Sequence, residues 1–128
     1  MRLLVDSHAV LWSVEDEAKL PPKVARLLAS GRNRQFVSIA TIWELATKVS
    51  IGRLRLTRPF DVVMRDAIEI HGYELLEVSV EHALRVATLP SLHGDPFDRM
   101  LVAQAIEERC TLVTSDRTLD AYPVETLW

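Results

Sequence analysis

The chain has 128 residues, a formal net charge of −3 and 48% hydrophobic residues. Its length suits a single domain over residues 1–128, and its hydrophobic fraction excludes an intrinsically disordered chain. The negative net charge excludes a generally basic surface for binding nucleic acid, but it is compatible with a few basic residues around an acidic site. No apolar run approaches the roughly 18 residues that cross a membrane. Cys110 is the single cysteine, which indicates a reducing, cytoplasmic setting and a small buried side chain without chemistry of its own.

The first half of the chain alternates short apolar runs with helical patterns. Short continuous apolar runs are typical of strands buried on both faces of a parallel sheet, whereas apolar residues three and four apart indicate helices. Gly31 and Gly52 stand where helices should stop. Strands are expected at residues 3–5 and 35–39, and helices at 7–14, 21–28 and 40–51.

The second half begins with a connector over residues 52–59 and continues the alternation. Asp95 is a suitable helix cap and Pro96 suits the first helical position. Ser79 is a second cap, and His82 behind it is expected on the surface. The predicted helices cover residues 59–71, 79–88, 95–109 and a short stretch ending at 122, and the predicted strands cover 74–78, 111–114 and 124–127.

Strands that alternate with helices predict an α/β layered domain around a mainly parallel sheet. Such sheets bind ligands beyond the carboxyl ends of their strands, where the strand order reverses. Asp6 directly follows the first predicted strand and Asp116 follows the strand at 111–114. Asp98 begins the helix that leads into that second strand. The spacing therefore predicts three carboxylates near one edge of the sheet.

Asp98 and Glu44 each have a simpler structural explanation. Asp98 shares a helix face with the apolar residues at 101, 102 and 105, so its side chain should point toward the edge of the hydrophobic core rather than into open solvent. It could instead only complement the helix dipole. Glu44 points away from the apolar stripe of its own helix and precedes Lys48 by four residues, the spacing of a surface ion pair. Its place near the start of a helix at the same sheet edge keeps it a candidate.

Carboxylates at one edge repel one another unless a cation is present. Oxygen ligands favour Mg²⁺ or Mn²⁺ over zinc, and no His/Cys pair in the chain has the spacing of a zinc site. A hard cation with open positions suits hydrolysis of a phosphodiester by a metal-activated water. The sequence contains neither a glycine-rich phosphate loop nor a Gly-x-Ser-x-Gly nucleophile turn.

Four segments together resemble PIN-domain ribonucleases of the VapC toxin type. These segments are Val5-Asp6-Ser7-His8-Ala9-Val10-Leu11-Trp12, Val37-Ser38 through Trp43-Glu44 and Lys48, Leu89-Pro90 through Asp95-Pro96-Phe97-Asp98-Arg99, and Val113-Thr114-Ser115-Asp116. The resemblance implies a three-layer α/β/α sandwich around a five-stranded, mainly parallel sheet. It implies a metal-dependent endoribonuclease that is the toxin of a toxin–antitoxin pair.

The resemblance also assigns roles to individual residues. It implies that the catalytic, metal-binding acids are Asp6, Glu44, Asp98 and Asp116, with Mg²⁺ or Mn²⁺ as the cofactor. The implied partners are an RNA substrate, a cognate antitoxin that blocks the site, often with a basic side chain, and a second copy of the chain in a homodimer. Thr114 or Ser115 is a candidate for holding a metal-bound water, whereas capping explains Asp95.

Basic, aromatic and histidine residues near these segments have open roles. Arg53, Arg55, Arg58 and Arg99 are candidates for phosphate contacts, although the first three are equally compatible with an ordinary solvated surface. Trp12 and Trp43 could stack on a base, but core packing is the simpler explanation. His8 and His93 are expected to make cap or loop contacts.

Two other classes of protein compete with the nuclease. A phospho-acceptor signalling domain also has an acid after its first strand, but it needs adjacent acids there and a lysine near its last strand. Here Ser7 follows Asp6, and no lysine occurs after Lys48. A catalytically inactive PIN-like binding module is the other alternative, and the complete set of four acids argues against it.

Overall fold

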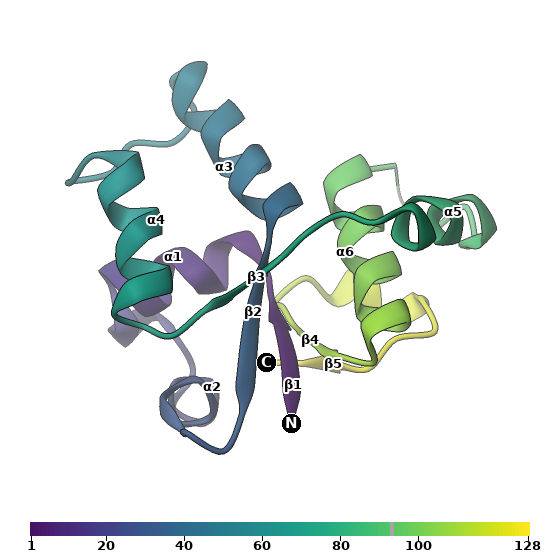
Figure 1. The fold of residues 1–128 in the computed structure, drawn as a ribbon, viewed down its shortest axis with the longest axis horizontal. Helices are drawn as coiled ribbons and strands as arrows, with labels where there is room; N and C mark the ends of the chain where they lie inside the picture. Colours follow the sequence, from purple (N-terminus) through teal and green to yellow (C-terminus); the bar gives the residue numbers. More distant parts are fainter. Residues whose placement is uncertain (93) are drawn as a thin grey trace.

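Five short strands form one parallel sheet at the centre of the molecule, in the order β3-β2-β1-β4-β5 (Figure 1). The computed structural model describes residues 1–92 and 94–128, so the contact expected of His93 lies outside the described residues. All four neighbouring strand pairs are parallel. The strands are β1 (Arg2–Val5), β2 (Arg34–Ser38), β3 (Glu74–Leu76), β4 (Thr111–Val113) and β5 (Thr126–Leu127).

The strand order reverses between β1 and β4. The chain proceeds outward from β1 to β2 and β3, then returns to the other side of β1 to form β4 and β5. Because parallel crossovers are right-handed, the reversal places the intervening helices on opposite faces of the sheet. Residues that directly follow β1 and β4 therefore lie at the switch point, as predicted for Asp6 and Asp116.

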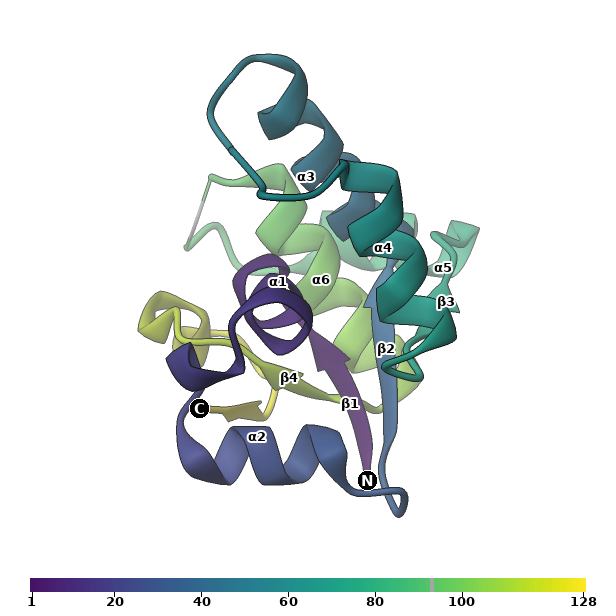
Figure 2. The ribbon, with the colours of Figure 1, turned by 90° about the vertical axis from the view of Figure 1, so that its left-hand side faces the viewer.

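Helices cover both faces of the sheet and confirm the three-layer sandwich (Figures 1 and 2). One face carries α1 (Ser7–Glu15), α2 (Pro22–Ala29) and α4 (Phe60–Glu69), and the other carries α5 (Val80–Thr88) and α6 (Pro96–Glu108). Helix α3 (Ile39–Ser50) continues from β2 and projects beyond the carboxyl end of the sheet. No helix in the described ranges is long and apolar enough to cross a membrane.

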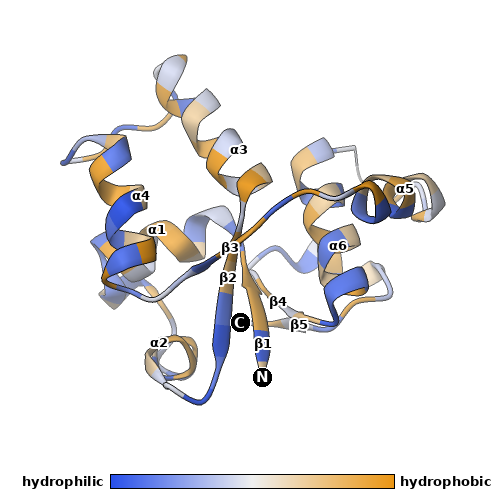
Figure 3. Cartoon of the chain, viewed as in Figure 1, coloured by the Kyte–Doolittle hydropathy of each residue, from blue (hydrophilic) through white to orange (hydrophobic). Residues whose placement is uncertain are grey.

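Alternate residues of the central strands enter two different cores. Leu3 and Val5 pack with the helices of the α1 face, whereas Leu4 packs with residues of α6. Val113 and Leu112 of β4 divide in the same way. Because successive side chains of a strand point to opposite faces, a sheet covered on both sides needs apolar residues in succession, and Figure 3 shows β1 and β2 turning from blue at their amino ends to orange toward their carboxyl ends.

The predicted elements all exist, with differences at their ends. The edge strands β3 and β5 are shorter than predicted, because each has a single neighbouring strand to pair with. The short helix before Tyr122 is a 3₁₀ helix at Arg117–Ala121, and a further 3₁₀ turn forms at Glu17–Lys19. Gly52 has a φ of +75°, a left-handed conformation that ends the α3 region as its position predicted, and Gly72, after α4, has a φ of +74°.

His82 is buried, so the prediction of a surface position was wrong. Its Nδ1 accepts a hydrogen bond from the Ser79 backbone N–H at 3.0 Å, and the Ser79 hydroxyl in turn accepts from the His82 N–H. Its Nε2 lies 3.0 Å from Glu108 Oε1 on α6. The side-chain nitrogen of Gln104, also on α6, lies 3.3 Å from His82 Nδ1. These α6 partners are more than 20 residues away in the sequence, which is why local periodicity did not reveal them. Cys110 is buried, as expected.

Candidate active site

Asp6 stands at the junction of β1 and α1, where its carboxylate caps the helix. Its Oδ1 accepts a hydrogen bond from the Ala9 N–H at 3.0 Å, and the Thr114 hydroxyl also hydrogen-bonds it. Burial raises the pKa of Asp6 above its ordinary value, and this effect outweighs the two hydrogen bonds and the nearby His8, which lower it. The sheet edge therefore holds a carboxylate whose charge is poorly solvated.

Glu44 reaches the same region from α3. Its charge raises the pKa of Asp6 further, which places the two carboxylates within electrostatic reach of each other. Glu44 is buried, although the apolar stripe of its helix predicted that it points away from the core. Helix α3 contacts α1, α4 and α6, so more than one of its faces is covered. The suggested ion pair with Lys48 does form, at 2.9 Å, but around a buried carboxylate.

Asp116 follows β4 and is connected to Asp6 through Thr114. The Asp116 N–H donates to the Thr114 hydroxyl at 3.1 Å, while the same hydroxyl hydrogen-bonds Asp6. The Asp116 carboxylate caps the 3₁₀ helix at Arg117–Ala121, accepting from the Thr118 N–H at 3.0 Å and from the Thr118 hydroxyl at 2.6 Å. Buried Thr114 thus links the ends of the two strands at the switch point.

Asp98 occupies the first turn of α6 and is half-buried. Its N–H donates to the carboxylate of the cap, Asp95, at 3.1 Å. The neighbouring Phe97 ring meets Trp43 of α3 edge-on, with the ring centroids 5.1 Å apart. Because Trp43 precedes Glu44, this contact places the start of α6 beside the part of α3 that carries the acid.

The described residues bring together part of the predicted acid set. Asp6 and Glu44 are electrostatically coupled, Asp116 is connected through Thr114, and Asp98 lies on the adjoining helix end. Across residues 1–92 and 94–128, no three His, Cys, Asp or Glu side chains form a group that could hold a metal ion. The structure therefore defines a carboxylate pair with two further acids nearby in the fold.

The donor chemistry of this edge fits a hard cation. The coupled side chains offer carboxylate oxygens alone, which Mg²⁺ and Mn²⁺ favour. Thr41 adds an observation that the sequence did not suggest: its hydroxyl is buried and has no hydrogen-bond partner among the described residues. Thr41 lies three residues before Glu44, on the same face of α3. Helix α3 thus carries a buried hydroxyl with unused hydrogen-bonding capacity one turn before Glu44.

The predicted phosphate-binding arginines divide into two groups. Arg58 pairs with Glu15 of α1 and Asp66 of α4, which fixes the 52–59 connector to both helices. Arg99 donates to the carbonyls of Pro90 and Val86 and to the Tyr122 hydroxyl. Both side chains therefore have structural partners. Arg53 and Arg55 are exposed on the connector and keep their role as candidates for phosphate contacts.

The two tryptophans also differ. Trp12 is half-buried and packs against His8 and Trp128, as core packing predicts. Trp43 is 65% exposed, so core packing does not account for it. It borders an apolar groove of about 720 Å³ between α3, α5 and α6, whose lining includes Val86, Phe97 and Met100.

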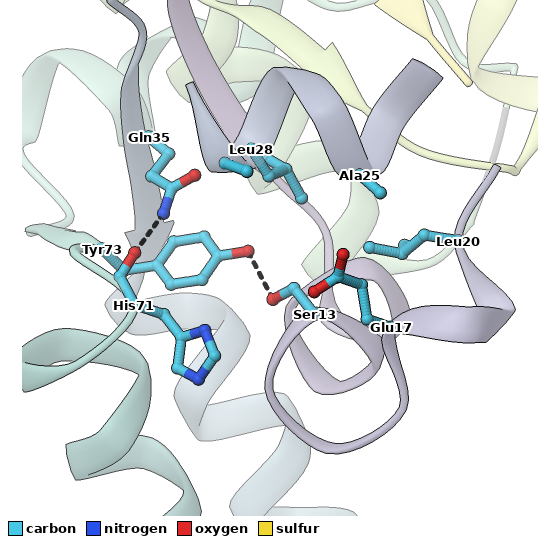
Figure 4. A pocket seen from close by; sticks show the side chains of 9 residues that line it. Ser13, Glu17, Leu20, Ala25, Leu28, Gln35, His71 and Tyr73 are labelled. Carbon is cyan, nitrogen blue, oxygen red and sulfur yellow. Dashed lines mark hydrogen bonds between the residues drawn. The ribbon is translucent and has the colours of Figure 1, made fainter. Parts of the chain in front are cut away.

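None of the four acids lines a small cavity of about 70 Å³ between α1, α2 and β2 (Figure 4). Ser13 donates to the Val10 carbonyl, so the Tyr73 hydroxyl donates to Ser13, at 2.7 Å. Burial raises the pKa of Tyr73 to about 12, which keeps the phenol protonated. Gln35 donates to the His71 carbonyl at the same cavity. The hydrogen bonds of Ser13, Tyr73 and Gln35 hold the 71–73 segment against α1 and β2, which is a structural role.

The protein is an α/β protein of the parallel-sheet class. Its strand order reverses beside two acids, Asp6 and Asp116, which follow the ends of neighbouring strands. The PIN domain family matches residues 3–125, and the chain belongs to it. This confirms the family expected from the four sequence segments.

Among curated proteins, the chain is similar to Ribonuclease VapC22 of Mycobacterium tuberculosis, with 29% identity over 120 residues, which covers 94% of this chain and 91% of that protein. Among solved structures, VapBC2 from Rickettsia felis bound to a promoter DNA fragment has a TM-score of 0.75 at 17% identity, covering 100% of this chain and 99% of that chain. DNA-bound VapBC from Salmonella typhimurium has a TM-score of 0.68 at 15% identity, covering 99% and 97%. These structures share the fold.

Proposed function

We propose that this PIN domain is an endoribonuclease that requires Mg²⁺ or Mn²⁺ and that acts as the toxin of a toxin–antitoxin pair in the cytoplasm. The observation that carries the proposal is the pair of like charges at the carboxyl edge of the sheet, half-buried Asp6 after β1 and buried Glu44 on α3. Two like charges in a poorly solvated place favour a cation between them. The similarity to a VapC ribonuclease supports RNA as the substrate.

The proposed mechanism assigns a role to each acid and to the groups that orient it. A bound divalent cation would stabilise charge on the scissile phosphate and favour ionisation of the attacking water. Asp6 and Glu44 would bind it, with Asp98 and Asp116 completing the acidic edge. The Thr114 hydroxyl and the Ala9 N–H fix the Asp6 carboxylate, so its oxygens need no reorganisation during the reaction.

Cleavage of RNA under controlled metal supply tests this proposal. Activity should disappear in excess chelator and return with Mn²⁺ or Mg²⁺. Because water attacks phosphorus directly, the products should carry 5′-phosphate and 3′-hydroxyl ends. Cleavage that persists in chelator would contradict the metal requirement, and 2′,3′-cyclic phosphate ends would instead assign the attack to the RNA's own 2′-hydroxyl. Transfer of phosphate from a small phosphodonor to the protein would support the phospho-acceptor alternative.

The proposed partners are a cognate antitoxin and a second copy of the chain. A similar solved structure is a toxin–antitoxin complex from Klebsiella pneumoniae, which supports an antitoxin that blocks the acidic edge. The apolar groove supports the homodimer. Val80 and Leu84 are exposed on α5, the helix that lines the groove through Ala83 and Val86, and Trp43 also lines it. A two-fold interface uses the same patch on both copies, so a patch that contains both projecting side chains and a groove can complement itself.

Measurement of molar mass in solution tests the dimer. Leu84→Glu should convert a dimer into a monomer, because it places a charge in the proposed interface. Ile70→Glu is a matched control, since Ile70 is equally exposed but lies at the end of α4. A native chain that is monomeric at all concentrations would refute the dimer.

A further inference from the structure

The ion pair between Lys48 and Glu44 is unequal in its exposure to solvent. The Lys48 Nζ lies 2.9 Å from Glu44 Oε2, and the two side chains are 38% and 10% exposed, respectively. A partly exposed ammonium group therefore pairs with an almost fully buried carboxylate.

The position of Lys48 is set by the end of α3. Its carbonyl accepts hydrogen bonds from the N–H groups of Arg53, at 2.8 Å, and Leu54, at 3.2 Å, which attaches the connector to the helix. The backbone of Lys48 is thereby fixed, and the spacing of four residues brings its side chain to Glu44. The side chain alone is left to change partner.

The charge of Lys48 is needed most when no metal is present. Asp6 is half-buried, Glu44 is buried, and the charge of Glu44 raises the pKa of Asp6, so the repulsion between the two carboxylates disfavours the folded state. Lys48 supplies a positive charge directly on one member of the pair. A divalent cation bound between the two acids would supply the same compensation and would be repelled by an ammonium group that stayed in place.

We propose that Lys48 is a positioning residue that occupies Glu44 while the site holds no metal and releases it when a divalent cation binds. The inference rests on the proposed metal dependence. Lys48 stabilises the metal-free fold and, through Glu44, competes with the metal. Removal of Lys48 should therefore lower the stability of the metal-free protein and raise its affinity for the metal. Removal of an ordinary surface ion pair would change the stability of the metal-free and metal-bound proteins equally.

Thermal melting and Mn²⁺ titration of the native protein and of Lys48→Met test the proposal. In chelator the variant should melt lower, by roughly 3–6 °C, as expected for a loss of about 1 kcal/mol in a domain of this size. Its affinity for Mn²⁺, measured by calorimetry without RNA, should rise about tenfold, because one repelling charge near the ion is absent. Lys48→Arg keeps the charge and should restore both values.

Lys19→Met is the matched control, since Lys19 makes an exposed ion pair with Asp16 at 3.8 Å, and it should change neither measurement. In a Glu44→Gln background, Lys48→Met should no longer lower the melting temperature in chelator. If Lys48→Met binds Mn²⁺ as tightly as the native protein or more weakly, Lys48 does not compete with the metal and the inference is wrong. If Mn²⁺ binds neither protein, the proposed metal dependence fails as well.

Discussion

The carboxyl edge of the sheet and the interface between α5 and α6 both bury polar side chains, but they combine charges in opposite ways. At the helix interface, buried His82 has a partner at each ring nitrogen, the Ser79 N–H at 3.0 Å and Glu108 at 3.0 Å. At the sheet edge, Asp6 and Glu44 are like charges in electrostatic contact, and burial raises the pKa of Asp6. The hydrogen-bonded arrangement at the helix interface stabilises the fold, whereas the repulsion at the sheet edge reduces the stability of the fold.

This difference shows where the fold accepts an energetic cost. Buried polar groups that only support a structure are expected to be hydrogen-bonded, as His82 is. Local violations of that rule concentrate at functional sites, because binding or catalysis makes use of them. Substitutions in the two regions should therefore separate activity from stability, and the following predictions test that separation.

The largest expected effect is on activity at the sheet edge. Asp6→Asn or Asp98→Asn should each reduce RNA cleavage by at least roughly 100-fold, the scale of losing one key electrostatic group. Asp61→Asn, which removes an exposed acid from the first turn of α4, should leave the rate unchanged. Rates are measured with saturating Mn²⁺ on proteins shown to be folded. Near-native cleavage by Asp98→Asn would leave Asp98 as a residue that only complements the dipole of α6.

The helix interface should respond in stability instead. His82→Leu removes the acceptor of the Ser79 N–H and the partner of Glu108, and should lower the free energy of unfolding by about 2 kcal/mol, as expected when buried polar groups lose their partners. The cleavage rate of the fraction that remains folded should not change. Denaturant unfolding and a rate per folded molecule measure the two quantities. A loss of activity at full stability would mean that His82 takes part in the reaction.

The contrast between these regions also marks the limit of what the sequence predicted. Strand-end positions located Asp6 and Asp116 correctly, because a parallel sheet brings the carboxyl ends of its strands to one edge. The burial of Glu44 and of His82 was predicted wrongly, because helical periodicity assigns one buried face to each helix. Glu44 is buried on a helix that contacts three other helices, and His82 is buried with partners on α6. The spacing of apolar residues within one helix does not predict burial that is caused by segments distant in the sequence.

A smaller effect is expected on stability when one charge of the acid pair is removed without metal. Because the pKa of Asp6 is raised in the folded state, its contribution to stability is fully present below its ordinary pKa and is lost as the pH rises through the raised value. Asp6→Asn keeps the helix cap but not the charge. In chelator it should therefore exceed native stability by roughly 1 kcal/mol at neutral pH, the scale of one close charge contact in a solvated setting.

The pH dependence of that difference is its check. The advantage of Asp6→Asn should shrink as the pH falls and vanish below pH 3.8, the ordinary pKa of the carboxyl group. Melting curves of the two proteins across this range, in chelator, measure it. A constant difference at all pH values would assign the effect to packing rather than to charge.

The smallest expected effect concerns Thr41, the hydroxyl at the sheet edge whose hydrogen-bonding capacity is unused among the described residues. Valine has the same shape without the hydroxyl, so Thr41→Val should stabilise the metal-free protein by up to about 1 kcal/mol, since a buried polar group without a partner is costly. If the hydroxyl serves the bound state of the site, the variant should also gain less stability from Mn²⁺ than the native protein. Thr47→Val is the control, because its exposed hydroxyl already donates to the Trp43 carbonyl at 2.9 Å on the same helix. An equal gain from Mn²⁺ in Thr41→Val and the native protein would show that Thr41 belongs to the scaffold, and a lower melting temperature in chelator would show that its hydroxyl has a partner after all.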